Sequence, residues 1–192
     1  MGRGARVERV RRLGGGIAQA THALSIVDAS GAAREVVLQQ WTRPGWEVED
    51  PGFGPAKEAA VLGALAGGPV PVPEVIAVDA DGDETGSPAL LMGRLPGRPP
   101  TVAQVLRRET VATLAETLVA LHRLAAERWS PELVAIVPAY HAFGDMASTV
   151  IPANRRRPDL WAEAVRIASQ PPPRTRSILI HRDFHAGNTL WL

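Results

Sequence analysis

The sequence contains no cysteine and only one lysine, Lys57. Without thiols the chain can form neither disulfide bonds nor zinc–thiolate sites, and this composition fits a reducing cytoplasm. No stretch approaches the roughly 20 consecutive apolar residues of a membrane span. The arginine-bearing N-terminus also lacks the apolar segment of a secretory signal. We therefore expect a cytoplasmic protein with no membrane partner.

An excess of charge of one sign is missing as well. The 21 basic and 20 acidic residues leave a formal net charge of +1, so no overall field favours a polyanion. The arginines near the N-terminus and at Arg155–Arg157 are offset by acids and are not interleaved with aromatic residues, which argues against nucleic acid as a partner. A hydrophobic content of 45% over 192 residues is enough for one domain or two small lobes.

The last dozen residues carry the clearest motif. An apolar run, Ser177–Ile180, predicts a buried strand, and in the polar loop that follows Asn188 stands five positions after Asp183. With His-Arg directly before the aspartate, this is the spacing of a kinase catalytic loop, in which the aspartate deprotonates a hydroxyl and the asparagine oxygen binds magnesium. Asp183 is therefore the candidate catalytic base and Asn188 the candidate metal ligand. A polar turn whose side chains cap backbone amides fits the same residues.

Glycines and alternating apolar residues organise the N-terminal half. Strands are predicted over Val7–Leu13, Thr21–Asp28 and Arg34–Trp41. The glycine turn Gly14–Gly16 separates the first two strands and lets the backbone turn sharply or approach a ligand closely. In a kinase-like arrangement this turn covers the nucleotide phosphates, whereas taken alone it fits a tight turn without a ligand.

The remaining elements are marked by prolines, glycines and helical periodicity. Helices are predicted over Pro55–Ala66, Val102–Arg107 (capped by Thr101), Thr110–Arg128, Ala142–Val150 and Asp159–Ser169, and strands over Glu74–Val78 and Pro88–Met92. The segments 42–54 and 79–86 are expected to be loops. The apolar stripe expected to face the core from the longest helix comprises Val111, Leu114, Ala115, Leu118, Leu121, His122 and Ala125.

The string His181-Arg182-Asp183-Phe184-His185-Ala186-Gly187-Asn188 resembles the His-Gly-Asp-Phe-His-Pro-Gly-Asn signature of the aminoglycoside phosphotransferase family. The resemblance implies an α+β, protein kinase-like two-lobe fold, with an antiparallel sheet and one helix in residues 1–95 and a helical C-lobe, incomplete at its C-terminus, in residues 96–192. It implies phosphoryl transfer from ATP or GTP, with Mg²⁺, to a small-molecule hydroxyl. The nucleotide-site residues that it implies are Gly14, Gly15 and Gly16 at the phosphates, Gln39 and Glu58 beside them, and Gly93, Arg94 and Leu95 at the adenine.

The sequence departs from this family pattern at several positions. Arg182 stands where the family usually has glycine, Ala186 where it often has proline, and Ala18-Gln19 where Ser-Asn is common. Gln39 replaces the lysine or arginine that holds the phosphates, and the chain ends before the second magnesium-binding aspartate. We therefore expect a fragment whose last strand, Thr189–Leu192, has an unpaired edge able to self-associate. The alternative is a degenerate kinase-like protein that binds nucleotide weakly or serves as a non-catalytic interaction module.

Overall fold

The computed structural model describes residues 4–14, 19–49, 53–128, 130, 131, 133, 156–170 and 179–192. The chain forms two compact units, one of Met1–Pro138 with Ile178–Leu192 and one of Ala139–Ser177. The larger unit is α+β, as predicted, and contains every described residue of the candidate site. Gly15, Gly16 and the helix predicted over Ala142–Val150 lie outside the described residues, and the lobe boundary at residue 95 stays a prediction.

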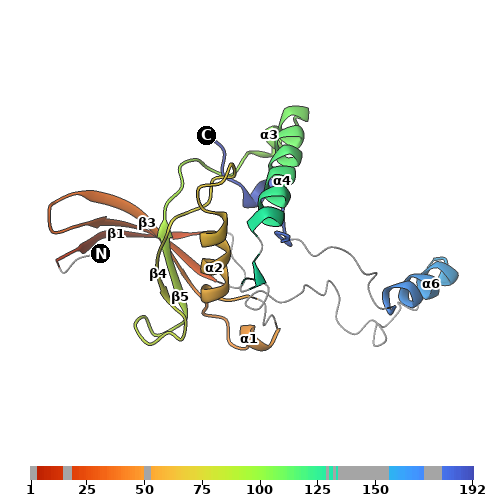
Figure 1. Cartoon of the computed structure of the whole chain (residues 1–192), viewed down its shortest axis with the longest axis horizontal. Coiled ribbons are helices and arrows are strands. Elements are labelled where there is room, and N and C mark those ends of the chain that lie inside the picture. Colours follow the sequence, from red (N-terminus) through yellow and green to blue (C-terminus); the bar gives the residue numbers. More distant parts are fainter. Residues whose placement is uncertain are drawn as a thin grey trace. The chain divides into compact units, whose positions relative to one another are not determined.

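A five-stranded antiparallel sheet forms the N-terminal half of the larger unit (Figure 1). The strands lie in the order β1-β2-β3-β5-β4. Their bounds are Arg6–Leu13 for β1, Ala20–Val27 for β2, Ala33–Gln40 for β3, Val75–Asp79 for β4 and Ala89–Gly93 for β5. All five strands were predicted within one or two residues, because glycine and proline turns separate runs of β-branched and apolar residues.

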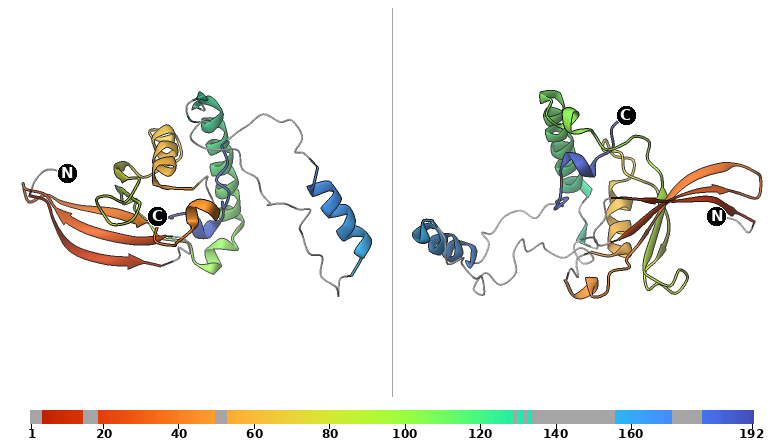
Figure 2. Two further views of the ribbon diagram at one scale, coloured as in Figure 1. Left: turned by 90° about the horizontal axis from the view of Figure 1, so that it is seen from below. Right: turned by 180° about the vertical axis from the view of Figure 1, so that it is seen from behind.

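One face of this sheet packs against α2 (Pro55–Leu65) (Figures 1 and 2). In the sheet register Val37 lies opposite Met92 and Gln39 opposite Leu90, so these side chains share a face. Leu90 and Met92 form a core with two tryptophans, and Ala59 and Leu62 of α2 pack on it. Gln39 therefore lies on the face that α2 covers.

The tryptophan part of this core explains a short helix that the sequence did not predict. The segment expected to be a loop contains α1 (Trp46–Glu49). The Trp46 ring lies 6.2 Å from the Trp41 ring and so close to Gly54 that a Cβ there would sit 3.2 Å from it. Burial of an aromatic ring thus overrides the loop-forming prolines and glycines around it.

A second core joins α2 to the C-terminal half of the larger unit. Leu65 of α2, Leu121 and Leu124 of α4 (Arg108–Arg128), and Leu179 form one buried cluster. Leu179 comes two residues before the candidate catalytic loop, so burial of its side chain anchors the start of that loop to both helices. Leu179 and Ile180 are not in a strand, which contradicts the predicted strand as far as it is described.

The apolar stripe predicted for α4 is only partly buried. Leu121 and Leu124 are buried, but Val111 is 58% exposed and Ala115 is exposed too. Only the C-terminal half of the described helix meets the core with α2, so periodicity located the correct helix but overestimated its buried length. Before it, α3 (Val102–Val105) begins at the predicted cap, in which Thr101 and Gln104 exchange side chain to backbone hydrogen bonds.

The smaller unit contributes one described helix, α6 (Pro158–Ala168). Its N-terminus is held by an ion pair of 2.8 Å between Arg157 and Asp159, and its last turns by an i,i+3 pair between Glu163 and Arg166. Across the described part of the chain, no helix combines the length and apolar character that a membrane crossing needs.

Candidate active site

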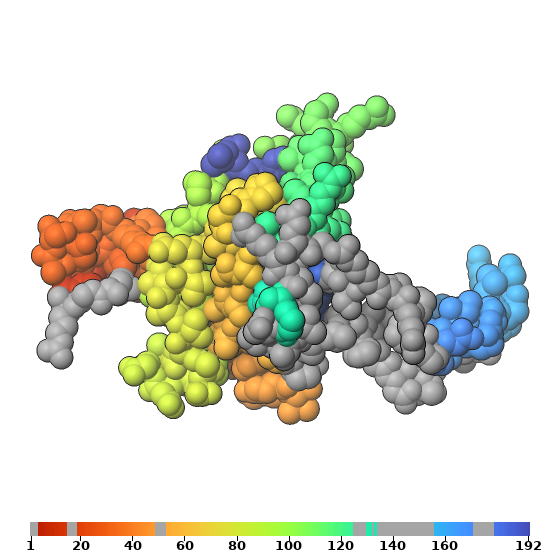
Figure 3. All heavy atoms as spheres, viewed as in Figure 1, coloured from red at the N-terminus to blue at the C-terminus, as the bar shows by residue number. Residues whose placement is uncertain are grey.

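The loop between Leu179 and Leu192 brings Asp183 and Asn188 into direct contact. Asn188 Nδ2 donates hydrogen bonds to the backbone oxygen of Asp183 at 3.0 Å and to its Oδ2 at 2.9 Å. The short 3₁₀ helix η2 (Ala186–Asn188) supplies the turn that closes this contact. The Asn188 amide nitrogen, which can only donate, is turned toward Asp183, and Oδ1 is the atom of this side chain that can accept a hydrogen bond or bind a cation. In the space-filling view the C-terminal residues lie at the surface (Figure 3, dark blue).

The backbone just before Asp183 is strained. Arg182 has φ of 68°, and the Asp183 N–H donates to the His181 carbonyl at 2.8 Å. A bond that spans two residues across a positive φ is a γ-turn of the rare kind. Such a conformation costs a non-glycine residue on the order of 1–2 kcal/mol. The turn projects the Asp183 side chain outward, where it is 76% exposed.

His185 is a member of this loop that sequence reasoning did not select. Its Nδ1 accepts a hydrogen bond of 3.0 Å from the Gly187 N–H and thereby caps η2. Its Nε2 lies 3.6 Å from Asp183 Oδ1. Cap positions usually signal themselves by serine, threonine, asparagine or aspartate, so a histidine cap left no recognisable signal.

The predicted adenine-binding stretch is held by the sheet. Gly93 donates its N–H to the Glu74 carbonyl at 2.8 Å, and Arg94 donates its N–H to the Glu35 carbonyl at 3.3 Å. The backbone donors of Gly93 and Arg94 are therefore already used. Leu95 follows directly, beyond the last residue of β5.

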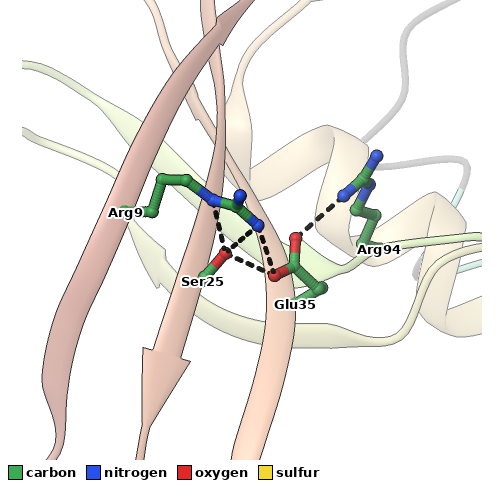
Figure 4. Close-up of polar contacts among 4 residues, drawn as sticks. All are labelled: Arg9, Ser25, Glu35 and Arg94. Carbon is green, nitrogen blue, oxygen red and sulfur yellow. Dashed lines mark hydrogen bonds and ion pairs between the residues drawn. The ribbon is translucent and has the colours of Figure 1, made fainter.

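A polar network fixes the Arg94 side chain across three strands (Figure 4). Arg94 Nη1 donates to Glu35 Oε2 at 2.8 Å. The Ser25 hydroxyl donates to the other Glu35 oxygen and accepts a hydrogen bond from the Arg9 guanidinium. Hydrogen bonds from Ser25 first, and from Arg94 second, hold the pKa of Glu35 below its usual value. The network joins the end of β5 to β1, β2 and β3 and so restricts the position of Arg94.

Gln39 and Glu58 meet through Gln19. Gln39 Nε2 donates to Gln19 Oε1 at 3.2 Å, and Gln39 Oε1 and Gln19 Nε2 are buried without a hydrogen-bond partner within the described residues. Burial raises the pKa of Glu58 to about 7, and the nearby Gln19 amide lowers it by less. Gln19 Nε2 approaches the Glu58 carboxyl without reaching good hydrogen-bond geometry. The positive charge that the family pattern would place at position 39 is thus replaced by the neutral amide pair of Gln39 and Gln19.

Comparison with known proteins identifies the family. The family model described as the phosphotransferase enzyme family matches residues 10–192, which is nearly the whole chain. The chain belongs to the phosphotransferase enzyme family. This match confirms the resemblance on which the site residues were chosen.

Two further comparisons give less. A solved structure of a provisionally assigned aminoglycoside phosphotransferase from Ralstonia eutropha JMP134 is 24% identical, with a TM-score of 0.40. The similarity covers 61% of this chain and 32% of that protein, so the matched part spans about a third of that protein's length. Among curated proteins none matches the chain.

In this phosphotransferase family member the candidate catalytic loop ends against the segment that follows β5. Arg98 N–H donates to the Trp191 carbonyl at 3.1 Å, and Trp191 N–H donates back to the Arg98 carbonyl at 2.9 Å. A Cβ on Gly97, whose φ is 103°, would lie 2.8 Å from the Trp191 oxygen, so glycine permits this approach. The strand predicted over Thr189–Leu192 is therefore wrong, because this segment forms only a single β-bridge, at Trp191. The backbone of Trp191, expected to be unpaired on one side, is paired with Arg98.

The donor set of the phosphotransferase loop suits magnesium bound together with a nucleotide. Among the described residues there is no group of three or more acidic or histidine side chains placed to hold a metal on their own. Magnesium commonly takes one or two protein oxygens and completes its shell with substrate phosphates and water. Asn188 Oδ1, on an amide group that Nδ2 anchors to Asp183, fits that pattern.

Proposed function

We propose that this chain works in a phosphotransferase that moves the γ-phosphoryl group of ATP or GTP to the hydroxyl of a small molecule. The observation that carries the proposal is the contact between Asp183 and Asn188. It joins a solvent-facing carboxylate to an asparagine amide group at the sequence spacing that phosphoryl transfer uses. The family match supports the reaction type. The absence of cysteine fits action in the cytoplasm.

The reaction assigns a separate task to each part of the site. Asp183 orients the acceptor hydroxyl and takes its proton as that oxygen forms a bond to the γ-phosphorus. The bond from that phosphorus to the bridging oxygen breaks, and the nucleoside diphosphate leaves with the electron pair. Asn188 Oδ1 would hold Mg²⁺, which would supply charge neutralisation at the phosphates. Gly14–Gly16 would lie over the phosphates and the Leu95 backbone beside the adenine.

The neutral amide pair makes a non-catalytic nucleotide-binding module the second candidate. A hydrogen bond from the neutral Gln39 amide is worth roughly half of one from a charged lysine or arginine. Burial raises the pKa of Glu58 to about 7, and no cation at position 39 stabilises the charged form of this carboxyl. This candidate predicts nucleotide binding without turnover.

The substitution Asp183→Asn tests the proposal. We expect it to lower the rate of phosphoryl transfer at least ~100-fold, because a general base contributes about that much or more, while the fold is kept because the side chain is exposed. Nucleoside diphosphate release should be measured with Mg·ATP and Mg·GTP over a panel of small alcohols. Transfer that survives in the variant within a few-fold would show that Asp183 is not the base, and binding without turnover in both proteins would favour the second candidate.

A further inference from the structure

The exposed His185 ring lies against two groups of the candidate catalytic loop, the Gly187 backbone N–H and the Asp183 carboxylate. We infer that His185 is a positioning residue for Asp183: the ring, anchored through Nδ1 to the Gly187 backbone, presents Nε2–H to Asp183 Oδ1 and sets the orientation of the carboxylate. This inference rests on the proposed role of Asp183 as the base, and it adds a residue that the family resemblance did not single out.

The anchor of the ring decides which nitrogen carries the proton. The Gly187 N–H donates to His185 Nδ1 at 3.0 Å, so Nδ1 must be unprotonated. In a neutral imidazole the proton then sits on Nε2. The backbone of η2 therefore selects the tautomer whose donor nitrogen faces Asp183.

Each carboxylate oxygen of Asp183 faces a different partner. Oδ2 accepts from Asn188 Nδ2 at 2.9 Å, and Oδ1 lies 3.6 Å from His185 Nε2. A separation of 3.6 Å is longer than a hydrogen bond, but catalytic contacts tighten when substrate binds. Each carboxylate oxygen has two lone pairs, so one donor on each oxygen still leaves lone pairs for the acceptor hydroxyl. Rotation of the carboxylate would loosen both contacts at once.

Gly187 makes room for the ring. A Cβ at this position would lie 2.8 Å from His185 Cε1 and 3.0 Å from Nδ1, distances that side-chain carbons do not tolerate. The His185 side chain is itself 56% exposed, so burial does not hold the ring in place. Its polar contacts to Gly187 and Asp183 are what fix it.

Two substitutions of His185 separate positioning from capping. His185→Ala removes both contacts, whereas His185→Asn keeps an oxygen that can accept the Gly187 N–H, as asparagine does at helix caps, but cannot reach Asp183. We expect both variants to lose kcat by roughly ten- to a hundredfold, as expected for a misoriented catalytic group, with an unchanged KM for the nucleotide. Wild-type kcat in His185→Asn would show that His185 is only a cap.

Gly187→Ala offers a second route that leaves the imidazole intact. The added methyl group should displace the ring, and kcat should fall as in His185→Asn. Circular dichroism spectra of the three variants should match the wild type, and the unfolding midpoint of His185→Asn should match it as well because this variant keeps the cap. A normal kcat in Gly187→Ala with a demonstrably displaced ring would overturn the inference.

A spectroscopic measurement tests the contact without any turnover. In ¹⁵N-labelled protein, with His185 assigned by its absence in His185→Asn, we expect the Nε2–H tautomer and a change in the Nε2 signal in Asp183→Asn. The Nδ1–H tautomer, or a signal that ignores Asp183→Asn, would contradict the inference. If this signature is present while the wild type transfers no phosphoryl group, the contact stands and the proposed function fails.

Discussion

Single residues of the catalytic loop explain both its geometry and its departures from the family pattern. Arg182, with φ of 68°, occupies a backbone conformation that glycine adopts without strain, and glycine is the residue that the family pattern expects there. The chain therefore keeps the turn and bears its conformational cost. Gln39 is a departure of another kind, because the neutral pair with Gln19 changes the charge of the site and leaves the backbone unaltered.

Replacing Arg182 tests the strain in this turn. Arg182→Gly and Arg182→Ala both remove the side chain, but only glycine relieves the positive φ. We expect the glycine variant to be more stable than the alanine variant by about 1 kcal/mol in the free energy of unfolding, measured by urea denaturation. Equal stabilities, or a more stable alanine variant, would show that Arg182 is not strained.

Restoring a charge at Gln39 tests the nucleotide site. Gln39→Lys places an ammonium beside Glu58 and, in the proposed site, beside the phosphates, so we expect tighter Mg·ATP binding by titration calorimetry. Gln40→Lys is the matched control, because adjacent strand residues point to opposite faces and Gln40 contacts Ser87 instead. A gain in the control, or none at Gln39, would place the phosphates elsewhere.

At the scale of elements, the sequence predicted what local patterns determine. Alternation and glycine or proline boundaries located all five strands and α2, and the Thr101 cap located α3. The two apolar runs that flank the candidate catalytic loop predict strands, yet Leu179 packs into a core between helices and Trp191 makes one bridge to Arg98. Short apolar runs cannot report which distant segment will pair with them. The histidine cap of η2 was missed for the same reason, since it depends on the folded turn.

The bridge between Arg98 and Trp191 depends on Gly97. Gly97→Ala would bring a Cβ within 2.8 Å of the Trp191 oxygen, whereas Gly86, with φ of 76°, has open space around it. Both substitutions meet a positive φ, so their difference isolates the collision. We expect Gly97→Ala to cost more free energy of unfolding than Gly86→Ala by about 1–3 kcal/mol. Equal losses would mean that the loop does not close against this segment.

Charge and protonation act on the molecule as a whole. Residues 101–192 contain eleven arginines and eight acidic residues, so the helical part present here carries no acidic excess for a polycationic acceptor. Glu58 adds a titrating group near neutral pH, because burial raises its pKa to about 7. Two predictions, one on aminoglycosides and one on the pH dependence of stability, rest on this distribution.

The stability of the chain should fall as the pH rises from about 4.5 to 7. Glu58 has an ordinary pKa of 4.5 and a folded value of about 7, so in this window the folded state holds a proton that the unfolded state has released. The contribution is fully present below pH 4.5 and is lost through pH 7, by up to about 3 kcal/mol. Urea denaturation across this range should show the decline, and Glu58→Gln should flatten it. An identical decline in Glu58→Gln would assign it to another group.

Expression of the chain in a sensitive bacterium should confer no aminoglycoside resistance, because residues 101–192 carry more arginines than acidic residues and so offer no net negative charge to a polycation. Minimum inhibitory concentrations for a panel of aminoglycosides should match those of cells that express Asp183→Asn. A clear rise with the unaltered chain alone would show that polycations are accepted.

The proposed function requires that the loop holding Asp183 and Asn188 bind a metal–nucleotide complex. We would measure the affinity for ATP and GTP by titration calorimetry, with and without Mn²⁺ in place of Mg²⁺. The electron paramagnetic resonance signal of Mn²⁺ would report binding of the metal. We predict that the metal tightens nucleotide binding in the wild type, and that Asn188→Ala removes this gain while leaving the metal-free affinity unchanged. A metal-dependent gain that is the same in Asn188→Ala and in the wild type would show that Asn188 does not bind the metal.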